Sequence, residues 1–587
     1  MGRRVFASLT VFALALGVVF PTTVAAGSGS GGSAVSFHKV NVTGIDPQVL
    51  PYLLDKNRQL DLMVELSDQP VATLVGNATD AGSAVTSTDR ATWRSKIKAN
   101  QTPVVDAIKS HGGRVISQVQ DAYNGIHVHL AAGSVAAIAA LPNVVAVHLV
   151  PTYKPQLTES VPYVGVPQAW SATGQTGAGE KIAVIDTGID YYHADFGGSG
   201  SVADYTYGLA HDTTLPATNA DGTTVAFPSA KIPVGYDFVG DAYDAAATAG
   251  SPATIPHPDG NPLDCDSHGT HTASTAAGYG ELSDGSTYHG PYTPAAYGST
   301  DFKIGPGVAP NAQLYIYKVF GCAGSTDVVT EAINKAVEDG ADVISMSLGS
   351  DFGTSDTPDA VAAENASRAG VVVVAASGNA GTSAYMTSTP GSSSRTISVA
   401  ALDSNATFPG ATIGLSPTIS ALDANNGPLP VTGNLVVLKS GGGISLGCDA
   451  SEYSGLAGDI VVTARGTCAR VLRAQLGQAA GVAAVIMVNN GAGLPPFEGP
   501  IAGVTIPFIG VSEADGAALL AADGTPNVTI SSAGLLANPT YQQLADFSSW
   551  GPRFGDSALK PEVTAPGVSI VAAGMGTGDD VLVDSGT

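Results

Sequence analysis

The chain has 587 residues, of which 44% are hydrophobic and 13% are charged, and 72 of them are glycine. This length and composition are typical of a globular protein with a large buried core and many tight turns, and they exclude a disordered protein. The net charge is −25 and the sequence contains no basic stripe, so we expect no nucleic acid among the partners.

The first 26 residues are predicted to be a signal peptide. Arg3 and Arg4 precede an apolar run over residues 5–20, and small residues at 24–26 offer a cleavage site. A membrane anchor is the alternative, but the apolar run is short for a membrane span. We therefore expect a secreted or extracellular protein, the cell wall included, with no membrane span after signal removal.

A small α+β unit is predicted after a Gly/Ser-rich linker that covers residues 27–60. This unit extends over residues 61–150. Alternating apolar residues predict strands, and helical spacing predicts helices, at 62–66, 94–109, 126–130, 134–141 and 144–150. A β-α-β-β-α-β order of this kind is typical of an open-faced α+β sandwich.

From about residue 155 onward, buried strands alternate with helices, which predicts an α/β fold with a doubly wound, mostly parallel sheet. The expected strands cover residues 181–186, 314–319, 343–347 and 371–376. Between the second and third strands, an amphipathic helix is expected over residues 327–339, with Asp327 as its N-cap and Gly340 at its C-terminal stop.

Asp186 is the first candidate catalytic residue, because it stands at the carboxyl end of a buried strand, where open α/β sheets place their sites. A carboxylate in such a place needs a partner. An imidazole would serve, because the carboxylate could fix the tautomer of the ring. Taken alone, the Asp-Thr-Gly sequence at this point is more typical of a simple turn.

His268 is the second candidate, placed near the start of a helix that is rich in small residues. It could act as the base that takes the proton of a serine. The spacing of His268 and His271 leaves a metal site as the alternative. However, the local pattern has no third ligand and no glutamate between the two, so we predict no metal site. His271 is interpreted as a structural histidine.

Asn379 follows the expected strand over residues 371–376, and its amide could donate to the oxyanion of a tetrahedral intermediate. A Gly-Asn turn is the alternative interpretation. Downstream, residues 402–539 differ in character, with short apolar strands and an Ala-rich helix over residues 471–480. A second α/β unit is therefore predicted within this segment.

Asp186, His268 and Asn379, taken together in this order, resemble the catalytic residues of the subtilase family of serine peptidases. The resemblance covers about residues 160–400 and 541–587, so the catalytic domain would consist of residues 155–401 and 541–587. It implies a secreted serine endopeptidase in which Asp186 and His268 belong to the triad and Asn379 is the oxyanion donor.

The nucleophilic serine of that family directly follows a Gly-Thr pair, and this chain has Gly586-Thr587 as its last two residues. In the family, the serine also begins a central helix. We therefore expect this chain, as written, to be inactive. Two hypotheses stay open: an incomplete sequence of an active endopeptidase, and a truncated, non-catalytic binding protein or pseudoenzyme.

The resemblance also implies binding segments for polypeptide substrates. The segments that match the pocket before the scissile bond are Ser347, Leu348 and Gly349, with Ala376, Ser377 and Gly378. Gly324 is a further candidate, because its loop could form an edge that pairs with an extended substrate.

Two other segments resemble accessory parts of these enzymes. Residues 61–150 are similar to the inhibitory propeptide, which implies an intramolecular inhibitor and folding aid. Residues 402–539 resemble an inserted protease-associated domain, with a generic α/β insert as the alternative. The family needs no cofactor. Many members bind structural calcium, but the acidic residues here are too dispersed to name ligands.

Four cysteines fit an oxidising compartment. Three pairings are formally possible, and we favour the two local pairs, Cys265 with Cys322 and Cys448 with Cys468. None of them has the Cys-x-x-Cys spacing of a zinc site.

Overall fold

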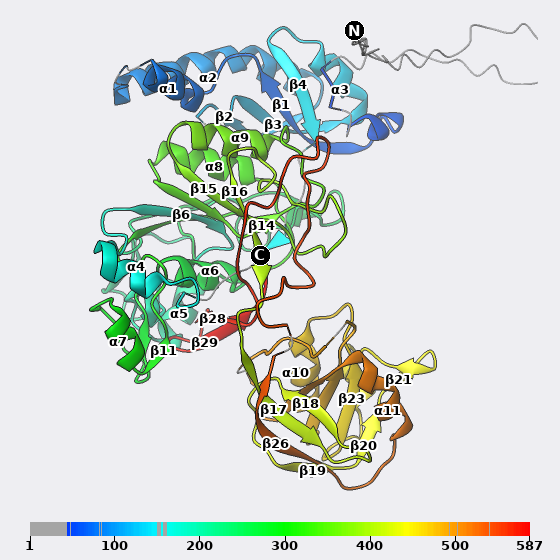
Figure 1. Ribbon diagram of the computed structural model, residues 1–587. Helices are drawn as coiled ribbons and strands as arrows, with labels where there is room; N and C mark the ends of the chain where they lie inside the picture. The colour runs from blue at the N-terminus through cyan, green and yellow to red at the C-terminus, as the bar shows by residue number, and fades with distance from the viewer. Residues whose placement is uncertain are drawn as a thin grey trace, which may run out of the picture. The chain divides into compact units, whose positions relative to one another are not determined.

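Three large β-sheets organise the described part of the chain (Figure 1). The computed structural model describes residues 44–46, 49–81, 83, 85–121, 123–149, 154–155, 161–491, 493–499, 501, 503–538 and 540–587. The predicted signal peptide and residues 27–43 of the predicted linker lie outside these ranges. Within them, no helix is both long enough and apolar enough to cross a membrane.

The first sheet is antiparallel and has the strand order β2-β3-β1-β4. Its strands are β1 (Gln59–Leu66), β2 (Arg114–Val119), β3 (Gly125–Ala131) and β4 (Val144–Leu149). The accompanying helices are α1 (Val71–Asp80), α2 (Ser87–Ser110) and α3 (Ala132–Ala139), preceded by a 3-10 turn at Leu50–Leu54. Apolar side chains of α2 and α3 form one core with alternate residues of the strands, such as Leu62 and Val64 of β1.

All three helices of this unit differ from the prediction, and α3 covers Ala132–Ala139 rather than residues 134–141. α2 begins at Ser87 rather than at residue 94, because Thr86 and Asp89 form a capping box. In it, the Asp89 amide donates to Thr86 Oγ1 over 3.2 Å and the Thr86 amide donates to Asp89 Oδ2 over 2.9 Å. α1 is absent from the prediction. Its Val71 and Val75 pack against Ile97 of α2.

The second sheet has seven strands in the order β27-β16-β15-β13-β6-β12-β9, and each neighbouring pair is parallel. Its strands are β6 (Lys181–Asp186), β9 (Val234–Asp237), β12 (Gln313–Lys318), β13 (Val343–Met346), β15 (Val372–Ala376), β16 (Ile397–Leu402) and β27 (Val563–Pro566). The predicted α/β fold with a parallel sheet is therefore confirmed.

Helices cover both faces of this sheet, as a doubly wound fold requires. They are α6 (His268–Ala277), α8 (Val329–Glu338) and α9 (Pro358–Arg368). Along β6, Ala183 and Ile185 share a core with α8 and α9. Ile182 and Val184 point the other way and share a core with α6. This alternation follows from the two-residue period of a strand.

The helix expected over residues 327–339 is α8, but Asp327 is not its N-cap. Val328 occupies that position and makes no side-chain cap bond. The Asp327 carboxylate instead accepts a hydrogen bond from the hydroxyl of Tyr243, so its acceptor is used in the core rather than at the helix start. Gly340 follows the helix with φ +77°, a left-handed conformation that suits a glycine stop.

The third sheet has eight strands in the order β19-β26-β17-β18-β25-β24-β23-β20. Its strands are β17 (Thr407–Ile413), β18 (Ile419–Asp423), β19 (Val431–Gly433), β20 (Leu435–Val437), β23 (Ile460–Ala464), β24 (Ala484–Val488), β25 (Phe508–Val511) and β26 (Val528–Ala537). The run from β20 through β23 and β24 to β25 is parallel, and the remaining pairs are antiparallel. α10 (Arg470–Ala480) and α11 (Gly516–Ala521) accompany this sheet.

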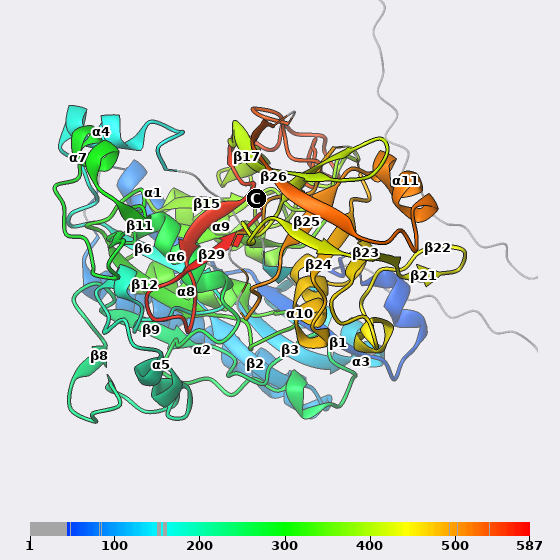
Figure 2. The ribbon, with the colours of Figure 1, turned by 90° about the horizontal axis from the view of Figure 1, so that it is seen from below.

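Shorter elements complete the described chain. The helices are α4 (Val166–Thr173), α5 (Val202–Leu209) and α7 (Pro294–Ser299). The two-residue to four-residue strands are β5 (Lys154–Pro155), β7 (Ala217–Thr218), β8 (Val225–Phe227), β10 (Glu281–Leu282), β11 (Phe302–Ile304), β14 (Leu348–Gly349), β21 (Lys439–Ser440), β22 (Gly443–Ile444), β28 (Ile570–Ala573) and β29 (Val581–Asp584). β28 and β29 form an antiparallel hairpin, and in Figure 2 the red strand β29 leads to the C-terminus.

Candidate active site

Asp186 is the last residue of β6, at the carboxyl edge of the parallel sheet, and only 1% of it is exposed. Its Oδ1 accepts a hydrogen bond of 2.7 Å from the backbone amide of Thr187. Its Oδ2 accepts a longer bond of 3.3 Å from the hydroxyl of Thr272 on α6. The buried carboxylate is therefore held by donors on two different elements, as a buried acceptor requires.

His268 is the first residue of α6 and is also buried. Its Nδ1 lies 2.6 Å from Asp186 Oδ1, so the proton is on Nδ1 and is donated to the carboxylate. Burial lowers the pKa of His268, but the charge and hydrogen bond of Asp186 outweigh burial and raise the pKa above its usual value. Nε2 is buried and has no hydrogen-bond partner among the described residues.

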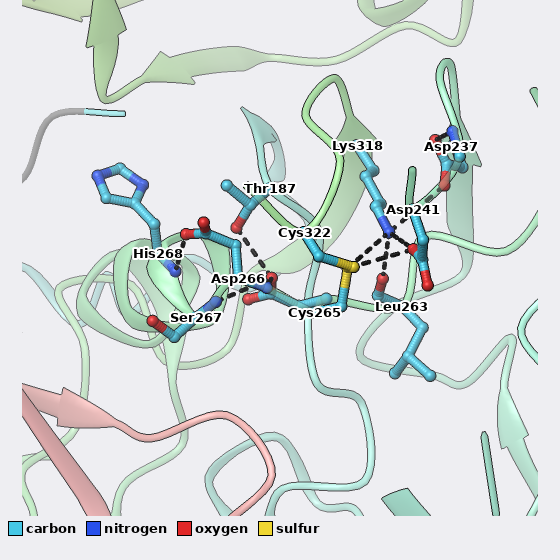
Figure 3. The surroundings of a disulfide bond; sticks show 12 residues. Thr187, Asp237, Asp241, Leu263, Cys265, Asp266, Ser267, His268, Lys318 and Cys322 are labelled. Atoms are coloured by element: carbon cyan, nitrogen blue, oxygen red, sulfur yellow. Dashed lines mark hydrogen bonds and ion pairs between the residues drawn. A yellow bond between two sulfur atoms is a disulfide. The ribbon is translucent and has the colours of Figure 1, made fainter. Parts of the chain in front are cut away.

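The loop that leads to His268 is fastened by the Cys265–Cys322 disulfide. Beside this bond, Lys318 at the end of β12 donates to the carbonyl of Leu263 over 3.0 Å and forms an ion pair with Asp241. Figure 3 shows the ammonium of Lys318 between these groups, next to the disulfide. A buried lysine stays charged only when paired, and the nearby carboxylates raise the pKa of Lys318 despite its burial.

Asn379 lies after β15, in contact with the last residue of the chain. Its Oδ1 accepts hydrogen bonds from the backbone amide and from the hydroxyl of Thr587, both over 3.0 Å. The Thr587 hydroxyl also accepts a bond of 3.1 Å from the Gly378 amide. Because its oxygen is held in this way, the side chain has Nδ2 left to donate to another group.

The segments predicted to bind substrate lie at the ends of two neighbouring strands. Ser347, Leu348 and Gly349 follow β13, whereas Ala376, Ser377 and Gly378 end or follow β15, and β13 pairs with β15. Both glycines lie against Ser388: a Cβ at Gly349 would stand 2.6 Å from the Ser388 Cβ, and one at Gly378 would stand 2.2 Å from its Oγ. Larger residues at these two positions would therefore collide with Ser388.

One of these segments is already paired with another part of the chain. Leu348 and Gly349 form β14, which pairs antiparallel with Lys154 and Pro155 of β5. These two residues therefore pair with a segment that the sequence analysis predicts to bind substrate. Gly324, in contrast, lies in the loop after β12 and packs against Asp244. A Cβ at Gly324 would lie 2.5 Å from the Asp244 Cγ.

His268 and His271 do not share a ligand-binding geometry. His268 directs Nδ1 to Asp186, whereas His271 Nε2 lies 3.0 Å from the carbonyl oxygen of Ile570 on β28. Burial lowers the pKa of His271, which is consistent with a neutral ring in a core position.

Asp241, Cys265 and Cys322 form the one group of three or more His, Cys, Asp or Glu residues within the described ranges whose ligand atoms lie close enough together to hold a metal ion. Both of its sulfurs belong to the disulfide, so neither can act as a thiolate ligand. Calcium takes oxygen ligands, of which this group offers only the carboxylate of Asp241. These residues therefore do not fit calcium.

Sequence reasoning missed residues that contact Asp186 or the start of α6. Thr187 and Thr272 touch Asp186 directly, and Asp264 binds the backbone before and after His268. The position of Asp264, four residues before His268, was the available signal. A turn-forming Asp is common before a helix, however, so its role emerges only from the contacts.

Comparison with known proteins gives a family for this arrangement. The subtilase family model matches residues 177–584, which is most of the chain. The chain is 28% identical over 585 residues to the minor extracellular protease Vpr of Bacillus subtilis, an alignment that covers 96% of this chain and 62% of that protein. It is 27% identical over 575 residues to the PII-type proteinase of Lacticaseibacillus paracasei, covering 90% and 28% respectively.

A plant relative shows the same similarity over a shorter region. The chain is 32% identical over 350 residues to the subtilisin-like protease SBT1.7 of Arabidopsis thaliana, covering 54% of this chain and 42% of that protein. The chain thus spans less than two thirds of the length of each of these three relatives.

Proposed function

Because the chain belongs to the subtilase family, we propose that it is part of a secreted serine endopeptidase that hydrolyses polypeptides. The observation that carries the proposal is the contact of 2.6 Å between His268 Nδ1 and Asp186 Oδ1, while Nε2 of the ring has no partner among the described residues. Asp186 fixes the tautomer, and His268 is the general base. The nucleophile is a serine that directly follows Thr587.

In the proposed reaction, the serine oxygen attacks the scissile carbonyl carbon while its proton passes to Nε2 of His268. Asp186 stabilises the imidazolium that forms. Asn379 donates through Nδ2 to the oxyanion, because Thr587 already holds its oxygen. His268 then returns the proton to the leaving amine, and a water molecule repeats the sequence to release the acyl group.

A cavity beside Thr587 supports a longer chain. It has a volume of about 470 Å³ and its lining is mainly apolar, from residues of β6, α6, β13, β15 and β27. A helix that starts after Thr587 would bury these side chains. The chain as written has no nucleophile, so we propose that it is inactive, and that the active form contains residues beyond Thr587.

We propose that residues 61–150 act as an inhibitory propeptide. The pairing of Lys154 and Pro155, just after this unit, with Leu348 and Gly349 of the proposed substrate-binding segment supports this role. The unit also contacts α8, where Glu331 lies 2.6 Å from Nδ1 of His127, and the buried amide of Asp121 donates to Asn334 over 2.6 Å. A unit held on α8, with the residues that follow it paired to the proposed substrate-binding segment, would block substrates.

We propose that residues 402–539 are a protease-associated domain that limits access to the site. The domain approaches the catalytic part closely at two glycines: a Cβ at Gly499 would stand 2.3 Å from Val583 of β29, and one at Gly491 would stand 3.4 Å from Asp546. β29 leads directly to Thr587, so the domain lies against the segment that would carry the nucleophile.

The proposal is tested on a chain extended by the residues that follow Thr587 in its gene. A fluorophosphonate probe should label a serine directly after Thr587, and the extended protein should hydrolyse casein. His268→Ala should lower kcat by about 10⁶-fold, because the base and nucleophile act as one unit. His257→Ala, an exposed histidine, is the matched control. A residue other than serine at that position, or an unlabelled extended protein, would reject the proposal.

A further inference from the structure

Asp264 is a fully buried carboxylate four residues before His268, with 0% of the residue exposed. Its Oδ1 accepts from the Thr187 hydroxyl (2.9 Å) and from the amides of Asp266 (2.9 Å) and Ser267 (3.2 Å). Its Oδ2 accepts from the amide (3.0 Å) and the hydroxyl (2.6 Å) of Thr270. Five donors converge on the two oxygens of one side chain, and hydrogen bonds to a carboxylate are stronger than those between neutral groups.

These bonds set the start of α6. The N-cap residue, Ser267, has φ +106° and makes no side-chain cap bond. Asp264 caps the helix instead, because its side chain accepts a hydrogen bond from the backbone amide of Thr270, the third residue of the helix. The left-handed backbone at Ser267 persists because its own amide is also bound to Asp264. The first residue of α6, and hence His268, is located by this carboxylate.

The same carboxylate reaches the residue that follows Asp186. The Thr187 hydroxyl donates to Asp264 and at the same time accepts from the amide of Gly269 over 2.7 Å. Thr187 and Gly269 directly follow the two residues proposed as catalytic. The segments also meet tightly, since a Cβ at Gly269 would stand 2.2 Å from the carbonyl oxygen of Gly188.

We infer that Asp264 is a positioning residue, which holds the Asp186–His268 pair at its hydrogen-bonded distance through Thr187 and the backbone of α6. This inference deepens the proposed function and rests on it for its consequence in catalysis. Asp264 acts on the proton at Nδ1 of His268 indirectly. Without the hydrogen bonds to Asp264, β6 and α6 are free to separate, and the hydrogen bond between His268 Nδ1 and Asp186 lengthens.

The first test uses this chain and needs no catalysis. Asp264→Asn places an amide group among five donors, so at least one of them faces a hydrogen instead of an oxygen. In ¹⁵N-histidine-labelled protein, we expect the downfield Nδ1 proton signal of His268 to weaken or vanish. We also expect the pKa of its ring to fall, because the carboxylate that raises it moves away.

Asp403→Asn is the matched control. Asp403 is also buried, and its carboxylate accepts from Asn405, Asn538 and Thr540, outside the loops that hold the pair. This variant should lower stability without changing the His268 signal. If Asp264→Asn does not fold, Thr187→Val removes the link to Asp264 and keeps the cap on α6. Thr187→Ser keeps the hydroxyl and should restore the signal.

The second test uses the extended protein. Asp264→Asn and Thr187→Val should lower kcat by about 100-fold with little change in KM, because the geometry of the base changes while the substrate edge does not. A folded Asp264→Asn variant that keeps the His268 signal, its pKa and kcat would overturn the inference. If the wild-type extended protein hydrolyses nothing, the proposed function fails, and the histidine signal still decides the role of Asp264.

Discussion

His268 and Asn379 share one feature at the scale of the residue. One polar atom of each side chain is held by a hydrogen bond, and the second polar atom can bind another group. His268 is held at Nδ1 by Asp186, and Asn379 is held at Oδ1 by Thr587. The remaining atoms, Nε2 and Nδ2, are the ones that the proposed reaction uses. Pre-oriented groups of this kind need no rearrangement when charge develops, which is why they stabilise a transition state.

His148 on β4 makes the stability of the N-terminal unit depend on pH. Burial lowers its pKa, but hydrogen bonds to Asp46 (2.9 Å) and Glu65 (3.0 Å) outweigh burial and raise the pKa to about 9. The folded value lies above the unfolded value of about 6.5. The stabilisation is therefore complete below about pH 6.5 and is lost as the pH rises through about 9.

We predict that His148→Gln lowers the opening free energy of β1 and β4 by on the order of 2 kcal/mol at pH 6 and by little above pH 9.5. Hydrogen exchange followed by mass spectrometry measures this difference, with exchange times corrected for pH. The exposed His211 provides the control, since His211→Gln should leave both strands unchanged. An equal loss at both pH values would show that the effect is packing, not charge.

At the scale of the element, the strands of the parallel sheet were the most predictable part of the chain. β6 covers the predicted residues 181–186, β13 and β15 differ from their predictions by one residue at one end, and β12 is displaced by one residue at both ends. Long apolar runs define such strands, because both faces of the sheet are covered. Helix starts were less predictable. α2 begins seven residues before the predicted start, since its capping box lies outside the apolar pattern.

The candidate site also has some features that could be predicted from the sequence and others that could not. The positions of Asp186 at the end of a strand and of His268 at the start of a helix could be predicted from the sequence pattern, whereas the catalytic roles of these two residues and of Asn379 stay proposals. Their orientation could not be predicted, because the bond from Thr587 to Asn379 joins residues 208 positions apart. The role of Asp264 depends on Thr187, which lies 77 positions earlier in the chain. Such contacts arise only from the folded topology.

The Cys448–Cys468 disulfide is the covalent link of the eight-stranded sheet, and it joins the chain before β23 to the start of α10. It closes a loop of 20 residues. Loop-closure entropy for this length predicts about 3 kcal/mol of stabilisation through the unfolded state. We predict that the double variant Cys448→Ser with Cys468→Ser loses about this amount in denaturant unfolding. The effect should vanish when both proteins are compared under reducing conditions, and a difference that persists there would contradict the explanation.

At the scale of the whole molecule, the proposed inhibitor and the proposed catalytic domain belong to one chain, so their separation requires a cut between them. We expect that cut near residues 151–160, between the two predicted domains. Self-cleavage needs a nucleophile, and residues 1–587 do not contain the proposed one. Glu331 and Asn334 would therefore keep their contacts with the N-terminal unit.

We predict that residues 1–587, secreted alone, keep the N-terminal unit after signal removal. Intact-mass analysis of the secreted protein should give one species that still contains residues 61–150. The chain extended beyond Thr587 is the positive control and should release a mature form. A mature species that begins near residues 151–160, made from residues 1–587 in a protease-free medium, would contradict the prediction.

The alternation along β6 limits how this strand can change in evolution. Ile182, Val184 and Asp186 all face α6, whereas Ala183 and Ile185 face α8 and α9. A substitution at one position alters only its local packing. Loss or gain of a single residue would instead exchange the two faces and turn the carboxylate away from His268. We therefore expect a single-residue insertion or deletion in β6 to do more damage than a conservative substitution of one of its apolar residues.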